Sequence, residues 1–358
     1  PANEYDPKVP KQIADILAKL LNKSPEQRYI STQGLINDLS LCQRQYQQNK
    51  EIQSFTLDND DFTEQLNFSS KLYGREQEIL TLLDAFAKTV KLKTKQVFVV
   101  RGYSGVGKSR LVQEVYKAVI EQQAYFITGK FEQYKKNKAY SALANALTDM
   151  VEQILGENEP RLRQWKKVLL EALGENAQLG IDFIPELEFI IGKQAPLTAL
   201  PPAESQTRFN VTIMNLFKAL CNQERAIALF LDDLQWSDFA TIALLKQLIE
   251  YQAIDNLFLI FSYRDNELSS THALTKLLDE ARQTTIPFTQ LEIKPLQSGA
   301  VLSLLSESLN LTTEKAAPLA KILMRKTAGN PFFTIEFIKS LKDKKLLYPG
   351  NDNHWEWD

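Results

Sequence analysis

The sequence predicts an α/β fold in which a parallel sheet is covered by helices on both faces and is followed by a small helical domain. Three observations predict it. Strand-like apolar runs alternate with helix-like runs from residue 71 to about 295, a pattern typical of parallel sheets. A glycine-rich segment, GYSGVGKS, separates one such strand from the next helix. Beyond about residue 296 only helical periodicity continues.

Composition limits the function classes. The chain has 358 residues, 44% of them apolar, enough for two or three compact units. Its 42 basic and 44 acidic residues give a net charge of −2, which argues against nucleic acid as a partner because no global basic field exists. No apolar run approaches the roughly 20 residues that span a bilayer, and the N-terminus lacks the parts of a signal peptide. We therefore expect a cytoplasmic protein without a membrane partner.

The N-terminal part is expected to be helical. Residues 1–48 predict two helices, about 10–22 and 32–48, which form the first domain. Residues 49–70 are polar and acidic and predict a linker. The two cysteines, Cys42 and Cys221, lie in helix-like runs and are expected to be reduced core thiols.

Residues 71–295 form the predicted α/β core. Strands are expected near 97–101, 124–128, 226–231, 257–263 and 286–293, with a long helical insert between about 139 and 222. Helices at 298–309 and 312–326, and a third after GNPFF, predict a helical lid over 296–345. Residues 346–358 are expected to begin a following module, with HWEWD as an edge strand.

The segment GYSGVGKS matches G-x-x-x-x-G-K-S/T and predicts a P-loop NTPase that binds a nucleoside triphosphate. VFVVR before it is strand-like, and SRLVQEVYKAVIEQ after it is helix-like, as this motif requires. Glycines allow backbone N–H groups to wrap the phosphates, the Lys108 ammonium adds charge, and the Ser109 hydroxyl reaches Mg²⁺. The expected nucleotide-binding residues of the loop are Gly102, Gly105, Val106, Gly107, Lys108, Ser109 and Arg110.

Two further polar groups follow predicted strands. Asp232 and Asp233 end the apolar run AIALFL, and the carboxyl ends of parallel strands face the ligand crevice. Asp232 is expected to hold Mg²⁺ and Asp233 to orient or deprotonate the attacking water; the alternative is a pair of turn acids. Arg264, after LFLIFSY, is expected to sense the γ-phosphate, and its alternative is a surface salt bridge.

Taken together, LYGRE, GYSGVGKS, LFLDDLQWSD, LIFSYRDNEL and TAGNPFF resemble the AAA-like STAND ATPases, of origin-recognition-like AAA type. The resemblance implies a five-stranded sheet of order 5-1-4-3-2, a helical lid, and ATP or ADP with Mg²⁺ as cofactors. It also implies that Gly329 and Pro331 contact the adenine, while Tyr73 and Arg75 close over the base from the other side. An alternative for GNPFF is a glycine that ends one helix and a proline that begins the next.

The segment ADILAKLLNKSPEQRY resembles the end of a protein kinase C-lobe, with Arg28 at the position of that family's conserved arginine. The catalytic motifs of a kinase are absent from this sequence, so we expect no kinase activity from it. Together the resemblances imply a segment of a large bacterial signalling protein that joins a Ser/Thr kinase to a STAND ATPase. Flanking kinase and sensor domains of the same polypeptide are then the expected partners, and a nucleotide-dependent oligomer is allowed.

The sequence leads to three hypotheses of function. The first is an ATP-binding, slowly hydrolysing regulatory switch of a multidomain signal-transduction kinase. The alternatives are a DNA-dependent, replication-initiator-like AAA ATPase and a scaffold that binds ADP without hydrolysis. The basic stretch GKFEQYKKNKAYSAL is interpreted as a solvated loop rather than a nucleic-acid stacking site. Arg208 either faces the nucleotide or caps a helix face, and the sequence leaves both open.

Overall fold

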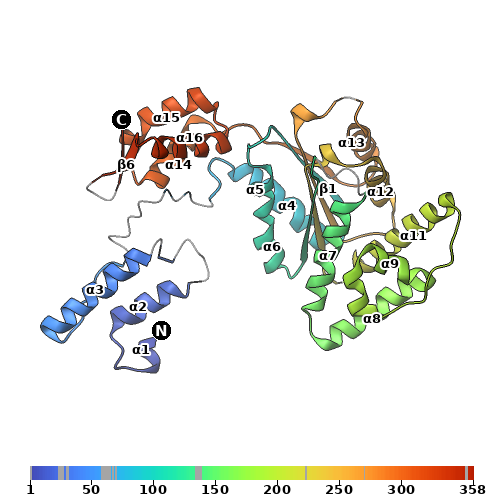
Figure 1. Cartoon of the computed structure of the whole chain (residues 1–358), viewed down its shortest axis with the longest axis horizontal. Helices are drawn as coiled ribbons and strands as arrows, with labels where there is room; N and C mark the ends of the chain where they lie inside the picture. Colours follow the sequence, from blue (N-terminus) through green and yellow to red (C-terminus); the bar gives the residue numbers. More distant parts are fainter. Residues whose placement is uncertain are drawn as a thin grey trace. The chain divides into compact units, whose positions relative to one another are not determined.

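The computed structural model describes residues 2–22, 28–29, 32–57, 66, 68, 71–133, 139–221, 224–269, 271–350 and 354–358. They form two compact units (Figure 1). The larger unit comprises residues 75–294, and the smaller comprises residues 1–74 together with 295–358. Within the described ranges, no helix is both long and apolar enough to cross a bilayer.

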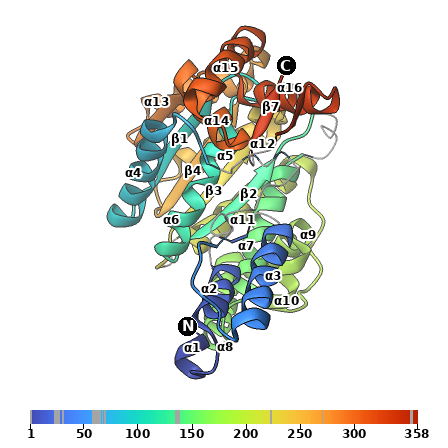
Figure 2. The same ribbon diagram turned by 90° about the vertical axis from the view of Figure 1, so that its left-hand side faces the viewer.

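Five parallel strands form the sheet of the larger unit, in the order β2-β3-β4-β1-β5; the labels of β1, β4, β3 and β2 follow one another across Figure 2. The strands are β1 (Gln96–Arg101), β2 (Tyr125–Lys130), β3 (Ile227–Asp232), β4 (Leu257–Tyr263) and β5 (Phe288–Glu292). Every neighbouring pair is parallel. The predicted order 5-1-4-3-2 is confirmed. Because β4 lies between β3 and β1, the residues that follow these three strands lie close together. They lie at the carboxyl ends of the strands, which we call the carboxyl edge of the sheet.

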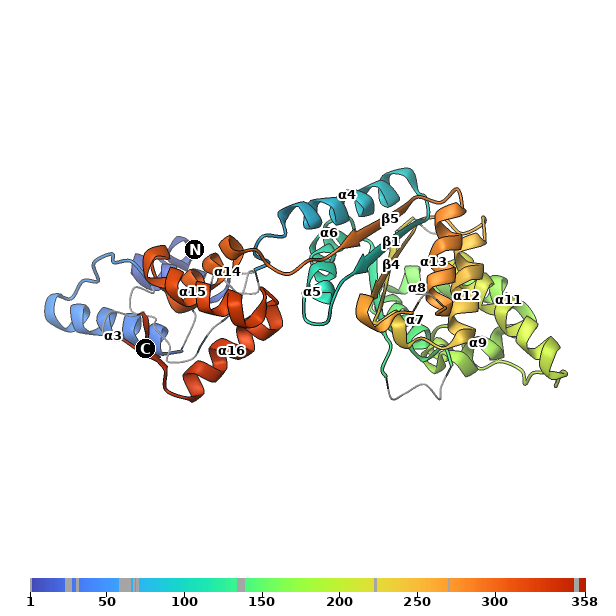
Figure 3. The ribbon, with the colours of Figure 1, turned by 90° about the horizontal axis from the view of Figure 1, so that it is seen from above.

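Helices bury both faces of this sheet. Figure 3 shows α4 (Glu76–Leu92) and the helices after the glycine-rich loop on one side, and α7 (Ser141–Leu155), α12 (Phe239–Glu250) and α13 (Ala273–Gln283) on the other. On the α4 side, the ring of Phe258 lies 5.8 Å from Phe86 and 5.9 Å from Phe98. On the other side, Val97 and Leu229 join the large cluster of the α7 to α13 helices. Successive side chains of a strand point to opposite faces of the sheet. Because both faces are buried here, both sets of side chains are apolar, and the sequence shows continuous apolar runs.

The helix expected after the glycine-rich loop is present but divided. It consists of α5 (Lys108–Gln113) and α6 (Val115–Glu121), with Glu114 between them in helical conformation at φ −65° and ψ −24°. The Glu114 N–H donates to the Leu111 carbonyl, three residues back. A hydrogen bond that reaches three residues back instead of four tightens the turn and interrupts the i to i−4 ladder.

The predicted helical insert between β2 and β3 is confirmed. After α7 it contains α8 (Glu159–Leu173), α9 (Ala177–Phe183), α10 (Glu188–Ile191) and α11 (Pro202–Cys221), with short 3₁₀ turns at Gly174–Asn176 and Pro185–Leu187. Its apolar residues continue the core of the sheet. Cys221 is buried there as a free thiol. Arg208 of α11 donates to the Thr198 carbonyl at 2.9 Å.

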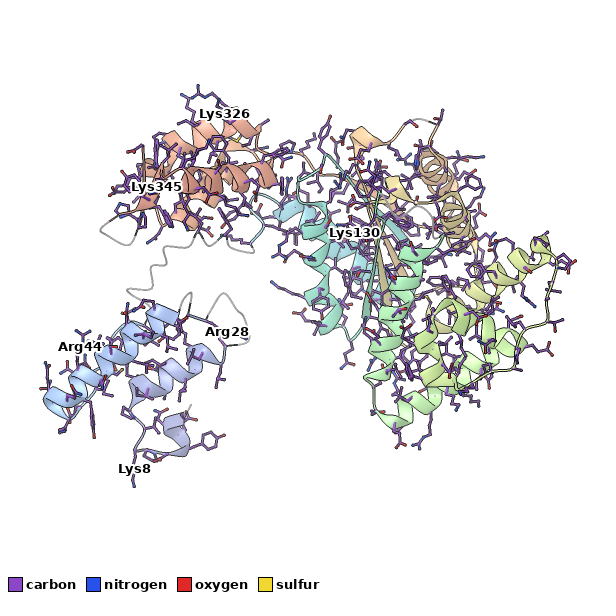
Figure 4. The ribbon with its side chains drawn as sticks, viewed as in Figure 1. Lys8, Arg28, Arg44, Lys130, Lys326 and Lys345 are labelled. Carbon is purple, nitrogen blue, oxygen red and sulfur yellow. The ribbon has the colours of Figure 1, made fainter. Side chains whose placement is uncertain are left out.

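In the smaller unit, residues 298–343 form three helices that pack around one apolar cluster. They are α14 (Ser298–Leu309), α15 (Thr313–Thr327) and α16 (Pro331–Asp343), the helices that the sequence predicts. The antiparallel strands β6 (Leu347–Pro349) and β7 (Trp355–Trp357) follow, and they bear out the expected strand in HWEWD. Trp355 is buried in the same cluster. Lys326, in the last turn of α15, and Lys345, two residues after α16, are exposed and are labelled in Figure 4.

The N-terminal residues form α1 (Ala2–Tyr5), α2 (Lys11–Leu20) and α3 (Thr32–Asn49). The last two agree with the two predicted helices, whereas the short α1 was not predicted. The Arg28 guanidinium donates to the Asn22 carbonyl at 2.7 Å, and the Tyr29 hydroxyl donates to Asp38 at 2.7 Å. Cys42 is buried as a free thiol. The whole KSPEQ segment and half of the predicted linker 49–70, including Asp58, Asp60 and Asp61, lie outside the described residues.

Candidate phosphate-binding site

In the loop between β1 and α5, Gly102, Gly105 and Gly107 all have positive φ, and the first and last of them are required for different reasons. Gly102 has φ +151°, and a Cβ there would lie 2.5 Å from the Ile293 carbonyl oxygen. Gly107 has φ +99°, but a Cβ there would meet nothing within 4 Å. Gly102 is therefore required because the backbone of Ile293 leaves no room for a side chain. Gly107 is required by its backbone conformation alone, and open space lies beside it.

Lys108 lies at the start of α5 with its ammonium inside the curve of this loop. It is buried, and its Nζ donates to the carbonyl oxygens of Gly102 at 2.9 Å and Tyr103 at 3.0 Å. Burial lowers the pKa of the Lys108 ammonium, whereas the Asp233 and Asp232 carboxylates oppose that decrease. A bound phosphate would also favour the charged form, because opposite charges stabilise each other at short range.

Ser109 and Asp232, the two predicted Mg²⁺ ligands, lie in direct contact. The Ser109 hydroxyl donates to Asp232 Oδ2 at 2.7 Å. On its other side, Asp232 Oδ1 accepts hydrogen bonds from the Ser262 hydroxyl and from the Asp233 backbone N–H. A hydroxyl and a carboxylate are hard oxygen donors of the kind that Mg²⁺ uses beside substrate phosphates. The residues present therefore fit a magnesium nucleotide.

Asp233 follows β3 in the left-handed region, with φ 59° and ψ 43°. Asp and Asn are among the few residues that adopt this conformation at modest cost, and strained backbone often marks functional sites. The side chain is buried. Its Oδ1 accepts from Arg264 Nε at 3.1 Å and from Gln235 Nε2 at 3.0 Å, and its Oδ2 lies 3.9 Å from Lys130 Nζ.

Arg264 follows β4 and reaches the same edge as Asp233. Besides that ion pair, its Nη1 donates to Glu267 at 2.9 Å, and its guanidinium lies 4.5 Å from the centre of the Trp236 ring. The salt bridge that the sequence left as an alternative is therefore present. A γ-phosphate contact for Arg264 stays a prediction.

Two loop residues have local roles of their own. Val106 is buried. The Arg110 guanidinium donates to Gln113 at 2.9 Å on the exposed side of α5. Any phosphate contact of these residues would come from their backbone N–H groups, as the motif predicts.

The residues predicted around the adenine have structural partners. The Arg75 guanidinium pairs with Glu78 at 3.1 Å and donates to the Lys294 carbonyl. Tyr73 is buried in the cluster formed by α14, α15 and α16, and its hydroxyl donates to Glu307 at 3.0 Å.

The helix-start interpretation of GNPFF is present in the smaller unit. The Asn330 side chain caps α16, Pro331 is its first residue, and Gly329 has φ +75°. A Cβ on Gly329 would lie 2.1 Å from the Leu296 carbonyl oxygen. The adenine contacts of Tyr73, Arg75, Gly329 and Pro331 stay predictions.

Three polar residues of this edge were not assigned to the site from the sequence. Gln235 and Ser262 are buried and contact the two aspartates, and Lys130 ends β2 beside Asp233 (Figure 4). A signal existed for each: Gln235 lies inside DDLQW, Ser262 is a lone hydroxyl in an apolar strand, and Lys130 comes two residues after the predicted strand 124–128. Residues 134–138 of the basic stretch lie outside the described residues.

Comparison with known proteins gives a family match. The family model described as "AAA ATPase domain" matches residues 71–260. Hybrid signal transduction histidine kinase G of Dictyostelium discoideum is 26% identical over 434 aligned positions, which cover 98% of this chain and 12% of that protein. Peroxide stress-activated histidine kinase mak3 of Schizosaccharomyces pombe is 20% identical, with 98% of this chain and 18% of that protein covered. The chain thus spans less than a fifth of these relatives.

Two solved structures have a partial likeness to this chain. Cdc6p from Pyrobaculum aerophilum has a TM-score of 0.41 and 11% identity, over 68% of this chain and 51% of that chain. The Orc1 protein of Aeropyrum pernix, solved in complex with DNA, has a TM-score of 0.42 and 13% identity, over 77% and 62%.

Proposed function

Because the chain belongs to the AAA ATPase domain family, we propose that it is an ATP-binding, slowly ATP-hydrolysing regulatory switch of a multidomain signal-transduction kinase. The observation that carries the nucleotide part is the contact between Ser109 Oγ and Asp232 Oδ2 at 2.7 Å, beside the buried Lys108. The family match supports ATP as the ligand. The histidine kinase names of the relatives support the signalling context.

The side chains at the sheet edge have distinct proposed roles. Lys108 binds phosphate oxygens, and Ser109 and Asp232 hold Mg²⁺, which neutralises phosphate charge when bound. Asp233 orients a water molecule and accepts its proton. Arg264 interacts with the γ-phosphate and thereby distinguishes ATP from ADP.

Slow hydrolysis suits a switch. The motifs supply no arginine finger, a group worth about 10³ to 10⁵ in rate where it is present. A slow rate gives the ATP state a long lifetime, during which neighbouring domains can respond to it. A switch of this kind requires two states with different nucleotide affinities.

Asp233→Asn tests the catalytic part of this proposal. Asn tolerates the same backbone conformation but is a poor proton acceptor, so we expect phosphate release to fall by about 10² or more while ATP affinity is retained. The assay measures phosphate release and ATP affinity of the purified chain. Asp149→Asn, at an exposed carboxylate that accepts from Thr128, is the matched control.

Two outcomes would contradict the proposal in different ways. If Asp233→Asn hydrolysed ATP at the parent rate, Asp233 would not be the proton acceptor, and another group would have this role. A parent protein that retains ADP and hydrolyses no ATP would instead support the scaffold hypothesis.

A further inference from the structure

Gln235 is a buried amide whose two ends are both engaged at the carboxyl edge of the sheet. It lies in the 3₁₀ turn Leu234–Trp236 after β3 and is 5% exposed. Its Nε2 donates to Asp233 Oδ1 at 3.0 Å, and its Oε1 accepts from the Arg264 backbone N–H at 3.1 Å. A flipped amide would face a carboxylate with its oxygen and an N–H with its NH₂ group. The two contacts therefore define one orientation.

This amide contributes to an unequal use of the two Asp233 oxygens. Oδ1 accepts from both Gln235 Nε2 and Arg264 Nε. Among the described residues, the polar partner found for Oδ2 is the Lys130 ammonium at 3.9 Å, beyond hydrogen-bonding distance. The Lys130 side chain is itself 65% exposed. Oδ2 is thus the oxygen that a water molecule can approach.

We propose that Gln235 is a positioning residue for ATP hydrolysis: it fixes the Asp233 carboxylate with Oδ1 occupied and Oδ2 available to water, and it ties this carboxylate to the end of β4. The inference rests on the proposed function and deepens it. Because Gln235 accepts from the backbone of Arg264 while Arg264 Nε binds Asp233, the three residues form a closed ring of hydrogen bonds. Removal of the amide leaves Asp233 held at Oδ1 by the arginine alone.

Glutamate at this position provides a specific chemical probe. An ionised carboxylate cannot donate to Asp233 Oδ1, whereas a protonated one can. Besides the Asp233 carboxylate itself, the charged groups around it are Asp232, Arg264, Lys130 and Lys108. The two aspartates favour protonation of an introduced carboxyl, and the three cations oppose it.

The experiment compares Gln235→Leu and Gln235→Glu with the parent chain in phosphate release and ATP affinity. At pH 8 we expect both variants to hydrolyse about 10- to 100-fold more slowly, as a small misplacement of a reacting group does, with ATP affinity within about threefold because no phosphate contact is removed. The ratio of the Gln235→Glu rate to the parent rate should rise as pH falls to 6, since the protonated side chain regains its donor. The corresponding ratio for Gln235→Leu should stay flat.

Gln96→Glu is the matched control, because Gln96 is equally buried but begins β1 at the opposite edge of the sheet. It should hydrolyse ATP at the parent rate at every pH. If Gln235→Leu fails to fold, the pH dependence of Gln235→Glu still decides.

Distinct outcomes separate this inference from the proposed function. Parent-like rates in folded Gln235 variants, or a Gln235→Glu ratio independent of pH, would overturn the positioning role alone. A large loss of ATP affinity in both variants would also overturn it and make Gln235 a binding or folding residue. A parent chain without hydrolysis would overturn the catalytic proposal and the positioning role with it.

Discussion

Asp233 and Arg264 form an ion pair at the edge of the sheet where ATP is proposed to bind, with 3.1 Å between Oδ1 and Nε. Glu267 and the Trp236 ring hold the same guanidinium. Contacts within the protein therefore define the position of the Arg264 guanidinium. The proposed interaction with a γ-phosphate would use a guanidinium that these contacts already hold in place.

Arg264→Ala should distinguish the two nucleotides. A guanidinium at the γ-phosphate makes a charge-assisted hydrogen bond that ADP cannot receive, so we expect ATP affinity to fall about 10- to 100-fold more than ADP affinity. Titration of both nucleotides against the variant measures this difference. Arg282→Ala, at a surface arginine paired with Asp279, should change neither affinity. Equal losses of ATP and ADP affinity would show that Arg264 does not contact the γ-phosphate and acts only through its ion pairs.

Single residues of the site were predictable to different degrees. Lys108, Ser109 and Asp232 belong to motifs whose spacing fixes their chemistry. Their contacts agree with that chemistry, since Ser109 touches Asp232. The roles of Gln235 and Ser262 depend on which strands are neighbours, and the residue pattern alone does not give that information. GNPFF allowed two interpretations because a helix start and an adenine contact require the same residues.

At the scale of elements, β2 and α7 approach each other unusually closely. A Cβ on Gly129 would lie 2.2 Å from the Ala142 carbonyl oxygen. β2 extends to Lys130, beyond the predicted end at 128, because Gly129 and Lys130 still pair with β3. A glycine in a strand is ordinarily read as a weak point, but here it admits the backbone of the helix that follows.

Gly129→Ala should therefore destabilise the larger unit by roughly 2 kcal/mol or more, because overpacking forces a backbone shift. The control is Gly156→Ala at the end of α7, where φ is −75° and the nearest atom to a Cβ is 3.4 Å away. That change should be nearly neutral or slightly stabilising. Chemical denaturation of both variants provides the comparison. Equal stability of the two would show that α7 moves away at little cost.

Lys95 connects the start of β1 to the end of α12. Its Nζ donates to the carbonyl oxygens of Leu248 at 2.8 Å and Tyr251 at 2.7 Å, and burial lowers the pKa of Lys95 from 10.5 to about 8. Between pH 8 and 10.5 the unfolded chain then binds more protons at this residue than the folded chain. Its contribution to stability accordingly rises with pH in that window.

Lys95→Met isolates this effect, because the other titrating groups are common to both chains. We expect the unfolding free energy of the parent, relative to that of the variant, to increase from pH 8 to pH 10.5. Denaturation curves at several pH values measure it. A difference that does not change with pH would show that the ammonium is as well solvated in the folded chain as in the unfolded one.

Most elements could be predicted because their residue patterns have strong physical causes. Strands buried on both faces show as apolar runs, and four of the five begin within one residue of the expected position. The division of the helix at Glu114 was not predictable, since it depends on one hydrogen bond that reaches three residues back instead of four. The sheet order came from the resemblance to a family and not from the residue pattern.

At the scale of the whole molecule, the predicted nucleotide residues belong to both compact units. The glycine-rich loop, the aspartates and Arg264 lie in the larger unit, and Tyr73 and Pro331 lie in the smaller one. Each of the latter two has a local explanation in its own unit, through Glu307 and through the start of α16. Sequence patterns cannot separate such a local role from a role in nucleotide binding, because both roles require the same residue types at these positions.

The central claim is that this chain binds Mg²⁺ and ATP through the loop at residues 102–109, and a melting scan tests it most directly. With ATP about 100-fold above its dissociation constant, binding should stabilise the parent by roughly 2.7 kcal/mol, or about 5–10 °C in melting temperature. Chelation of Mg²⁺ should reduce the shift. Lys108→Ala should abolish it, whereas Lys88→Ala, at an exposed lysine paired with Asp84, should retain it. No ATP-dependent shift in the parent, or an undiminished shift in Lys108→Ala, would contradict the claim.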